Sequence, residues 1–318
     1  MCVSNPPLQL SARPVPRATN CARLFLLMIL RIDQRQWEQT DRAALSHEGE
    51  VTAQLEAGMV LLLPELAFEV LPDERGHFSP SIAAAKNVSF DPSTGQVGGA
   101  TATAGGDSGW LVAMLRRFSD SAETLVTALF PGYRGRLHRA RASFRPAEIA
   151  GRKTTWRHDD TRLHIDSFPA TPVQGRRILR LFTNVNPDGR PRSWRLGEPF
   201  EEVAQRFGDR LRIPLPFSLE LLRLTGITKS RRSAYDALML QLHDLMKADL
   251  AYQARAQQMP IDFPAGSTWI GFTDQVSHAA MAGQYQLEQT FLLPVDAMER
   301  PEGSPLRVLE RLKDRRLV

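Results

Sequence analysis

The segment Thr161–Phe168 constrains the fold of this chain more than any other stretch. It is typical of a short strand, in which His164 and Asp166 point to the same side because strand side chains alternate between faces. An imidazole and a carboxylate on one face supply two of the three ligands of a 2-His-1-carboxylate iron site, which keeps further positions open for a co-substrate and O2. The segment therefore favours a sheet protein in which one more histidine comes close.

His278 is the best candidate for the third ligand. It follows a turn at residues 264–266, an apolar strand and a second turn at residues 273–275, and it opens the next strand. A distal histidine on a late strand is what an iron site in a double-stranded β-helix, or jelly roll, requires. The alternative is a chance His-x-Asp match, since the chain has seven histidines and short motifs carry a false-positive risk.

The composition is that of a globular protein with a mildly basic charge. Its 318 residues are 42% hydrophobic and 24% charged, with a net charge of +5. Fourteen arginines and one lysine lie between Arg134 and Arg195, a density that suits bidentate recognition of carboxylate or phosphate, although any single one is also compatible with a solvated surface. No recognition helix or zinc finger accompanies them, so nucleic acid is not an expected partner. The two cysteines, Cys2 and Cys21, form no disulfide framework or zinc site and fit a reducing cytoplasm.

The N-terminal part differs from the rest. Residues 1–27 are interpreted as a disordered extension or an early start assignment, with Met28 opening a strand over residues 29–32. The apolar run at residues 24–30 is too short to span a bilayer, which takes about 20 residues. We expect residues 28–318 to form a single domain with a helical insertion at about 218–258.

Three further elements bear on function. A helix from Asp107 or Ser108 to Pro131 has an apolar stripe that we expect to pack on the sheet. In the strand at residues 176–185, Arg180 either lies on the outer face or holds an anion inside, because an unpaired arginine is costly to bury. A long helix over residues 231–257 places His243 and Lys247 four apart; they could face a substrate, but a partly exposed, solvated face is the preferred interpretation.

Several motifs in this chain resemble those of the Kdo hydroxylase family, from about residue 30 to the C-terminus. They are Lys86–Ser89, Ser143–Pro146, Asp159–Pro169, Arg177–Arg180, Asn184–Pro187 and Phe272–Ala279. The resemblance implies an α+β protein with a jelly-roll (cupin-like) core, flanking and inserted helices, and an activity dependent on Fe(II), 2-oxoglutarate and O2, with ascorbate added in vitro.

The resemblance also implies site residues. His164, Asp166 and His278 match the catalytic iron triad of the family. It further implies an arginine that binds the far carboxylate of 2-oxoglutarate. Arg180 is the first choice and Arg145 the second, ahead of Arg177 and Arg162. No basic residue occurs in residues 279–290, where many such oxygenases carry this group, so an earlier strand must supply it.

The implied reaction is hydroxylation of C3 of 3-deoxy-D-manno-oct-2-ulosonic acid (Kdo) in Kdo2-lipid A, a lipopolysaccharide precursor of Gram-negative bacteria. 2-Oxoglutarate would be converted to succinate and CO2. Such a substrate predicts a peripheral protein on the cytoplasmic face of the inner membrane. The alternatives are an oxygenase for another substrate such as a protein side chain or free sugar acid, a non-catalytic jelly-roll sugar-binding protein, and a basic membrane- or nucleic-acid-binding protein.

Overall fold

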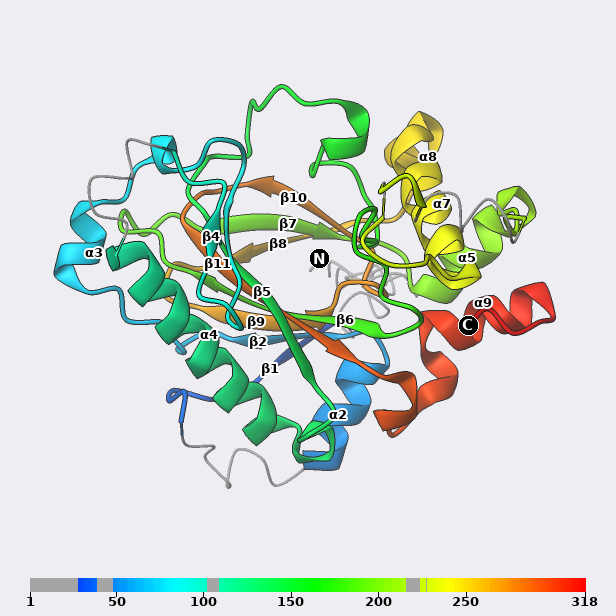
Figure 1. Cartoon of the computed structure of the whole chain (residues 1–318), viewed down its shortest axis with the longest axis horizontal. Coiled ribbons are helices and arrows are strands. Elements are labelled where there is room, and N and C mark those ends of the chain that lie inside the picture. The colour runs from blue at the N-terminus through cyan, green and yellow to red at the C-terminus, as the bar shows by residue number, and fades with distance from the viewer. Residues whose placement is uncertain (1–27, 39–47, 102–108, 216–223, 227) are drawn as a thin grey trace, which may run out of the picture.

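The computed structural model describes residues 28–38, 48–101, 109–215, 224–226 and 228–318, so the expectation for residues 1–27 lies outside the described part. The chain forms an eight-stranded and a three-stranded β-sheet (Figure 1). The large sheet has the order β1 (Ile29–Arg31), β2 (Val60–Leu63), β9 (Thr268–Phe272), β6 (Arg177–Asn184), β11 (Gln286–Leu293), β5 (His138–Arg145), β3 (Val88–Phe90) and β4 (Val97–Gly98). The small sheet has the order β10 (His278–Ala282), β7 (Arg192–Leu196) and β8 (Met259–Phe263).

Between β5 and β11 the chain passes repeatedly from one sheet to the other. It runs from β6 in the large sheet to β7 and β8 in the small sheet, back to β9, across to β10 and back to β11. The neighbouring strands among these are antiparallel. This winding is that of a double-stranded β-helix, as in jelly rolls. The predicted α+β fold with a jelly-roll core is confirmed, and the predicted strand after Met28 is present as β1, paired in parallel with β2.

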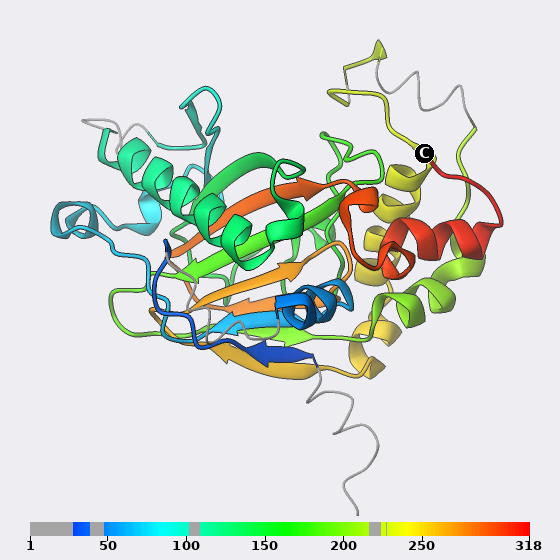
Figure 2. The same cartoon turned by 90° about the horizontal axis from the view of Figure 1, so that it is seen from below.

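The central strand β11 is buried along its whole length because both of its faces are covered. Its outward residues Leu287 and Phe291 belong to the apolar core that also contains the stripe of helix α4 (Gly109–Leu129). Ser119 on α4 donates to Oε1 of Gln289 at 2.7 Å and so joins the helix to the sheet. Figure 2 shows α4 lying across the outside of the large sheet. The predicted amphipathic helix before Pro131 is confirmed.

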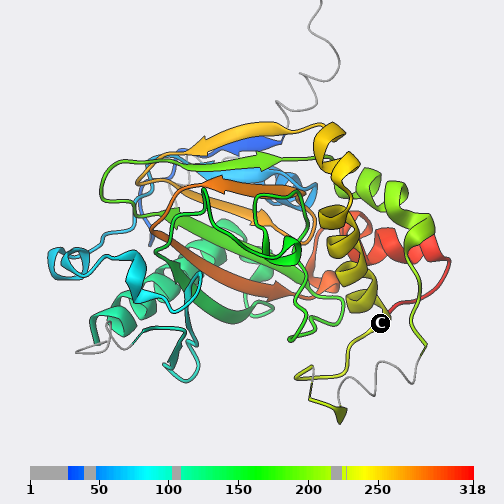
Figure 3. The ribbon, with the colours of Figure 1, turned by 90° about the horizontal axis from the view of Figure 1, so that it is seen from above.

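The other helices frame the two sheets. They are α2 (Glu48–Glu56), α3 (Pro72–Gly76), α5 (Phe200–Phe207), α7 (Ala234–Ala248), α8 (Leu250–Arg255) and α9 (Pro305–Lys313). Figures 1 and 3 show α5, α7, α8 and α9 gathered at one end of the sheets. Among the described residues, the helices between β7 and β8 begin with α5 at Phe200, and the part of the chain expected as a helical insertion at about 218–258 contains α7 and α8. The long helix expected over 231–257 is interrupted at Asp249, whose side chain caps the start of α8.

The segment with the His-x-Asp motif is less regular than predicted. Only His164 forms a β-bridge, with His278, so the expectation of a full strand over residues 161–168 is wrong. Asp166 lies beyond the bridge, and its backbone N–H donates to the carbonyl of Thr273 at 2.8 Å in the turn after β9. Among the described residues, no helix is both long and apolar enough to cross a membrane.

Candidate metal centre and its cavity

His164, Asp166 and His278 come together in space. One ligand atom from each side chain lies within 4.8 Å of the other two. The backbone holds the two histidines side by side, because the N–H of His164 donates to the carbonyl of His278 at 3.0 Å and the reverse bond measures 2.9 Å. Two imidazoles and one carboxylate at this separation form the donor set of a facial metal site.

The hydrogen bonds of the two rings leave the same nitrogen available on each. The Nδ1 atoms of His164 and His278 lie 2.7 Å and 2.8 Å from the carbonyl oxygens of Arg162 and Val276. Only a protonated Nδ1 can donate to a carbonyl, so each neutral ring presents an unprotonated Nε2. Metal-binding histidines are held in their ligating tautomer in this way. The rings are therefore oriented as an iron site requires.

The charge states also fit a metal. Burial, the neighbouring histidine and Lys247 hold the pKa of His164 well below its usual value, and burial lowers the pKa of His278. Burial alone would raise the pKa of Asp166, but Arg180 and the two histidines together hold it below the usual value. Neutral imidazoles and an ionised carboxylate are the forms that bind a divalent cation. In addition, the buried Oδ2 of Asp166 has no hydrogen-bond partner.

A cavity of about 450 Å³ opens onto this cluster. Its wall includes the inward face of β6, where Arg180 and Phe182 point to the metal-binding side chains. Nη1 of Arg180 lies 3.0 Å from Oδ2 of Asp166, an ion pair outside hydrogen-bond geometry, and Nη2 lies 3.5 Å from Oε1 of Glu288. Of the two positions that the sequence allowed for Arg180, the structure selects the inner one.

Arg145 reaches the same cavity from the end of β5. Its Nε donates to Oε2 of Glu288 at 2.9 Å, and its Nη1 lies 3.9 Å from Oδ2 of Asp160. Both candidate arginines thus line the cavity and share Glu288. Arg177 does not, because it is buried against Asp274. Arg162 is also directed elsewhere, since it bonds Asp159 and the carbonyl of Lys247.

Several cavity residues were not singled out from the sequence. Arg192, at the start of β7, is buried there, and its Nη1 donates to the carbonyl of Gly283 at 2.6 Å. The indole of Trp194 stacks on His278 with ring centroids 5.0 Å apart. The sequence held one indication of this: Arg192 and Trp194 are two positions apart in a strand, so their side chains share one face.

The interpretation of His243 and Lys247 as a solvated helix face is wrong. Both line the cavity, and Lys247 is only 2% exposed. The ring of His243 meets that of His164 edge-on at 5.5 Å. The pattern of α7 could not reveal this, because the cavity wall that covers this face includes Arg157, which lies 90 positions before Lys247 in the chain.

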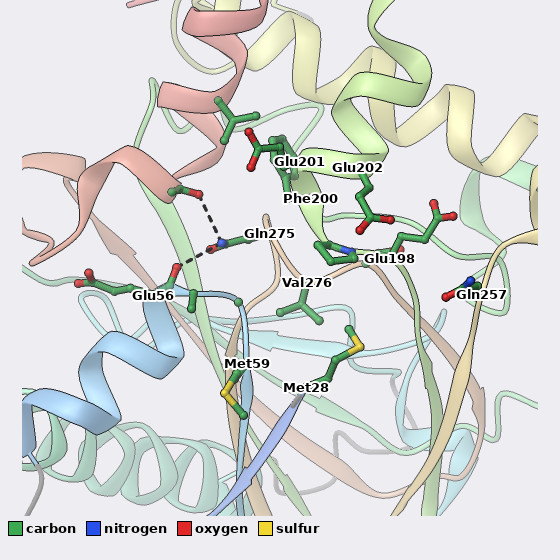
Figure 4. Close-up of a pocket in the computed structure, with 16 residues that line it drawn as sticks. Met28, Glu56, Met59, Glu198, Phe200, Glu201, Glu202, Gln257, Gln275 and Val276 are labelled. Atoms are coloured by element: carbon green, nitrogen blue, oxygen red, sulfur yellow. Dashed lines mark hydrogen bonds between the residues drawn. The ribbon is translucent and has the colours of Figure 1, made fainter. Parts of the chain in front are cut away.

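A second cavity of about 350 Å³ lies behind the turn that leads into β10 (Figure 4). Gln275 and Val276 form part of its wall, together with Met59 and Phe200. The amide of Gln275 donates to the backbone carbonyls of Glu56 at 3.2 Å and Gly303 at 3.4 Å. None of the described lining residues is a histidine, so this cavity is distinct from the metal centre, although Val276 also orients His278 through its carbonyl.

Comparison with known proteins agrees with this geometry. Residues 36–316 match the family model described as 3-deoxy-D-manno-oct-2-ulosonic acid (Kdo) hydroxylase. The chain is similar to the crystal structure of the Kdo hydroxylase KdoO, a non-heme Fe(II) alphaketoglutarate-dependent dioxygenase, in complex with alphaketoglutarate and Fe(III). The two share 45% identity and a TM-score of 0.87, over 91% of this chain and 97% of that one.

The apo structure of KdoO gives the same identity, TM-score and coverage, and its complex with succinate and Fe(III) is 44% identical, with a TM-score of 0.87 over 92% of this chain and 97% of that one. No curated protein matches the chain. The match to the family model covers most of the chain, and the relatives share both its fold and almost half of its residues. The chain therefore belongs to the Kdo hydroxylase family of Fe(II)/2-oxoglutarate-dependent dioxygenases.

Proposed function

We propose that the chain hydroxylates C3 of a Kdo residue in Kdo2-lipid A and that His164, Asp166 and His278 hold the Fe(II). The metal ligands are supported by the pair of Nδ1–carbonyl contacts, which leave Nε2 of both rings free beside an ionised Asp166, and the substrate is supported by the match to the Kdo hydroxylase family. Residues 28–318 would act as one oxygenase domain.

Bound Fe(II) and 2-oxoglutarate would use O2 to replace a C–H hydrogen of the substrate by hydroxyl, with succinate and CO2 as the other products. The protein supplies orientation and a water-poor environment for this chemistry. The carbonyls of Arg162 and Val276 fix the imidazole rings, and Trp194 covers one face of His278. The backbone bond from Asp166 to Thr273 fixes the position of this residue in the chain.

Arg180 is proposed to bind the far carboxylate of 2-oxoglutarate, with Arg145 in support. When Asp166 coordinates a metal ion, the metal partly neutralises its negative charge. Arg180 then has only the more distant Glu288 as a fully charged anionic partner. A buried guanidinium with a weakened partner favours binding of a new carboxylate. Arg145 has less capacity, because Glu288 already accepts a hydrogen bond from its Nε and forms an ion pair with its Nη2.

A glycolipid substrate also requires contact with a membrane surface. Leu250, the first residue of α8, is 66% exposed and follows Lys247 of the cavity wall by three positions. Leu224, in the same inter-strand insertion, is also exposed, and Arg231 and Arg232 follow it. Exposed leucines and arginines in one insertion are suited to the interface of an anionic bilayer. Flotation with anionic vesicles should recover the protein, and Leu250→Ser should weaken recovery.

The function is tested by succinate formation under air with Fe(II), ascorbate and 2-oxoglutarate, with and without Kdo2-lipid A. Succinate should rise with the lipid, the product should gain one oxygen by mass spectrometry, and both signals should vanish in His164→Ala. If succinate formed equally without the lipid, and a peptide or free sugar acid were hydroxylated, the reaction class would stand and the proposed substrate would be wrong.

A further inference from the structure

Lys247 is a buried ammonium group without a carboxylate partner. Its side chain lines the metal-centre cavity, and no carboxylate among the described residues lies within ion-pair distance of it. Its one hydrogen bond goes to the carbonyl of Arg157 at 3.0 Å. An ammonium group has three donors, so two remain for a ligand. Burial without a partner is costly for such a charge, and burial indeed lowers the pKa of Lys247.

The other cations near the centre are mostly neutralised already. Lys86 donates to both oxygens of Asp160 at 3.1 and 3.2 Å. Arg157 is paired with Asp244 at 3.0 Å. Arg145 and Arg180 have Glu288 between them. These groups can accept an anionic ligand only by sharing it with a carboxylate, whereas Lys247 can take one directly.

Arg192 is the other buried cation of the cavity without a carboxylate within 4.0 Å among the described residues, but it lies in a different part. It belongs to the small sheet and is tied to Gly283, at the connection between β10 and β11. Lys247 is on α7, beside Arg157, whose side chain is 59% exposed. Lys247 and Arg192 therefore lie on different walls of the cavity, one formed by α7 and the other by the small sheet.

The backbone keeps Lys247 in a fixed relation to the metal ligands. The carbonyl of Lys247 accepts from Nη1 of Arg162 at 2.7 Å. Gln253 on α8 bonds both the N–H and the carbonyl of Leu163, at 2.8 and 3.0 Å. Helices α7 and α8 are thus bonded directly to the two residues that precede His164. The backbone of Lys247 is thereby held next to the segment that carries His164.

We infer that Lys247 binds the C1 carboxylate of the Kdo unit that is hydroxylated, an inference that rests on the function proposed above. C1 is separated from C3 only by C2. When a C3–H bond faces the metal centre, the C1 carboxylate is therefore also close to His164 and His278. Lys247 and His243 are one helical turn apart and both line this side of the cavity. Because Nδ1 of His243 is engaged by Asp244, its Nε2 is the atom that faces a sugar hydroxyl.

The test compares two substrates and three proteins. The substrates are Kdo2-lipid A and the same lipid with its carboxylates converted to methyl esters, and the proteins are the full chain, Lys247→Met and Lys86→Met. Lys86→Met is the matched control, since it removes a cavity lysine that already has Asp160 as partner. Succinate and hydroxylated lipid are measured, together with KM for 2-oxoglutarate and the affinity of the Co(II)-loaded protein for each lipid without turnover.

Lys247→Met should weaken binding of Kdo2-lipid A, whose carboxylates are free, about 10- to 100-fold. This fold-change corresponds to the free energy of a hydrogen bond to a charged group. Binding of the methyl-ester lipid should stay nearly unchanged. KM for 2-oxoglutarate should stay within about twofold, because the ligand bound by Lys247 is the sugar. Lys86→Met should change the preference for acid over ester much less than Lys247→Met does, because Lys86 already has Asp160 as its partner. Unfolding temperatures establish that the variants are folded, which is expected because Lys247→Met removes an unpaired buried charge.

The inference is overturned if Lys247→Met keeps the full preference for acid over ester, or if it raises KM for 2-oxoglutarate instead. Failure of the proposed function has a different signature. In that case the unaltered chain would bind neither lipid and form no lipid-dependent succinate, while still converting 2-oxoglutarate.

Discussion

The buried ion pair between Arg177 and Asp274 provides a direct test of how the metal centre is supported. The two side chains are 0% and 1% exposed. Nε and Nη2 of Arg177 donate to the two oxygens of Asp274 at 2.8 and 3.2 Å, and Nη2 also donates to Gln275 at 2.6 Å. The guanidinium lies 3.9 Å from the ring centroid of Phe272. These contacts fasten the turn that carries Asp274 and leads to His278 onto the start of β6.

Arg177→Met leaves the carboxylate of Asp274 buried without a cation. The carboxylate is almost completely buried, so solvent cannot replace the guanidinium, and burial already raises the pKa of this carboxyl with Arg177 present. Breaking one side of a buried pair costs about 3–5 kcal/mol of unfolding free energy. For a chain of this size, that loss corresponds to a fall in Tm of roughly 4–8 °C. Fe(II) affinity should fall too, because Thr273 of the same turn holds the backbone of Asp166.

The assay is urea and thermal unfolding of the variant beside two others. Arg177→Met/Asp274→Leu should recover most of the loss, since replacing both partners by apolar groups is close to neutral. Arg136→Met breaks a pair with Asp296 whose side chains are 48% and 73% exposed, and it should cost less than about 1 kcal/mol. An Arg177→Met protein as stable as Arg136→Met would refute the reasoning, as would a double variant that is less stable than the single one.

Four further outcomes are expected. His278→Ala should weaken Co(II) binding more than about tenfold by titration, because it removes a ligand and not only its support. Arg180→Met should raise KM for 2-oxoglutarate about 10- to 100-fold with a much smaller change in KM for the lipid, the reverse of Lys247→Met. Phe118→Ala, in the fully buried stripe of α4, should cost about 3–5 kcal/mol of stability in urea unfolding. Gly283→Ala should lower Tm, because φ is +106° there and an added Cβ would lie 2.9 Å from the carbonyl of Pro191.

Short sequence patterns predicted the structure correctly where a single local rule, such as helical or strand periodicity, decides it. The 3.6-residue spacing of the stripe between Leu111 and Leu129 identified α4, because a helix on a sheet must bury one continuous face. Two-residue alternation grouped His164 with Asp166, and the turn before His278 marked the start of β10. The strand assigned around His164 was wrong because pairing there is limited to one bridge, and no local pattern reports how far a partner strand extends.

Patterns failed where the decisive neighbour is distant in the chain. Lys247 is a charged residue on a helix, and such residues usually lie on a solvated face. Here its ammonium group donates to the carbonyl of Arg157, and its own carbonyl accepts from Arg162, two residues before His164. Alternation placed Arg180 and Phe182 on one face of β6 but could not say which face is inside. That choice depends on β11, which lies beside β6 and brings Glu288 opposite Phe182.

Residue chemistry and short periodicities act over a few positions, so the donor types, their approximate elements and the class of fold could be predicted from the amino-acid sequence. Which cations face the metal centre, and which of them have carboxylate partners, follows from the folded structure alone. The reason is physical: the cost of burying Arg180, Arg192 or Lys247 depends on groups within about 4 Å in space, and those groups come from other strands and helices.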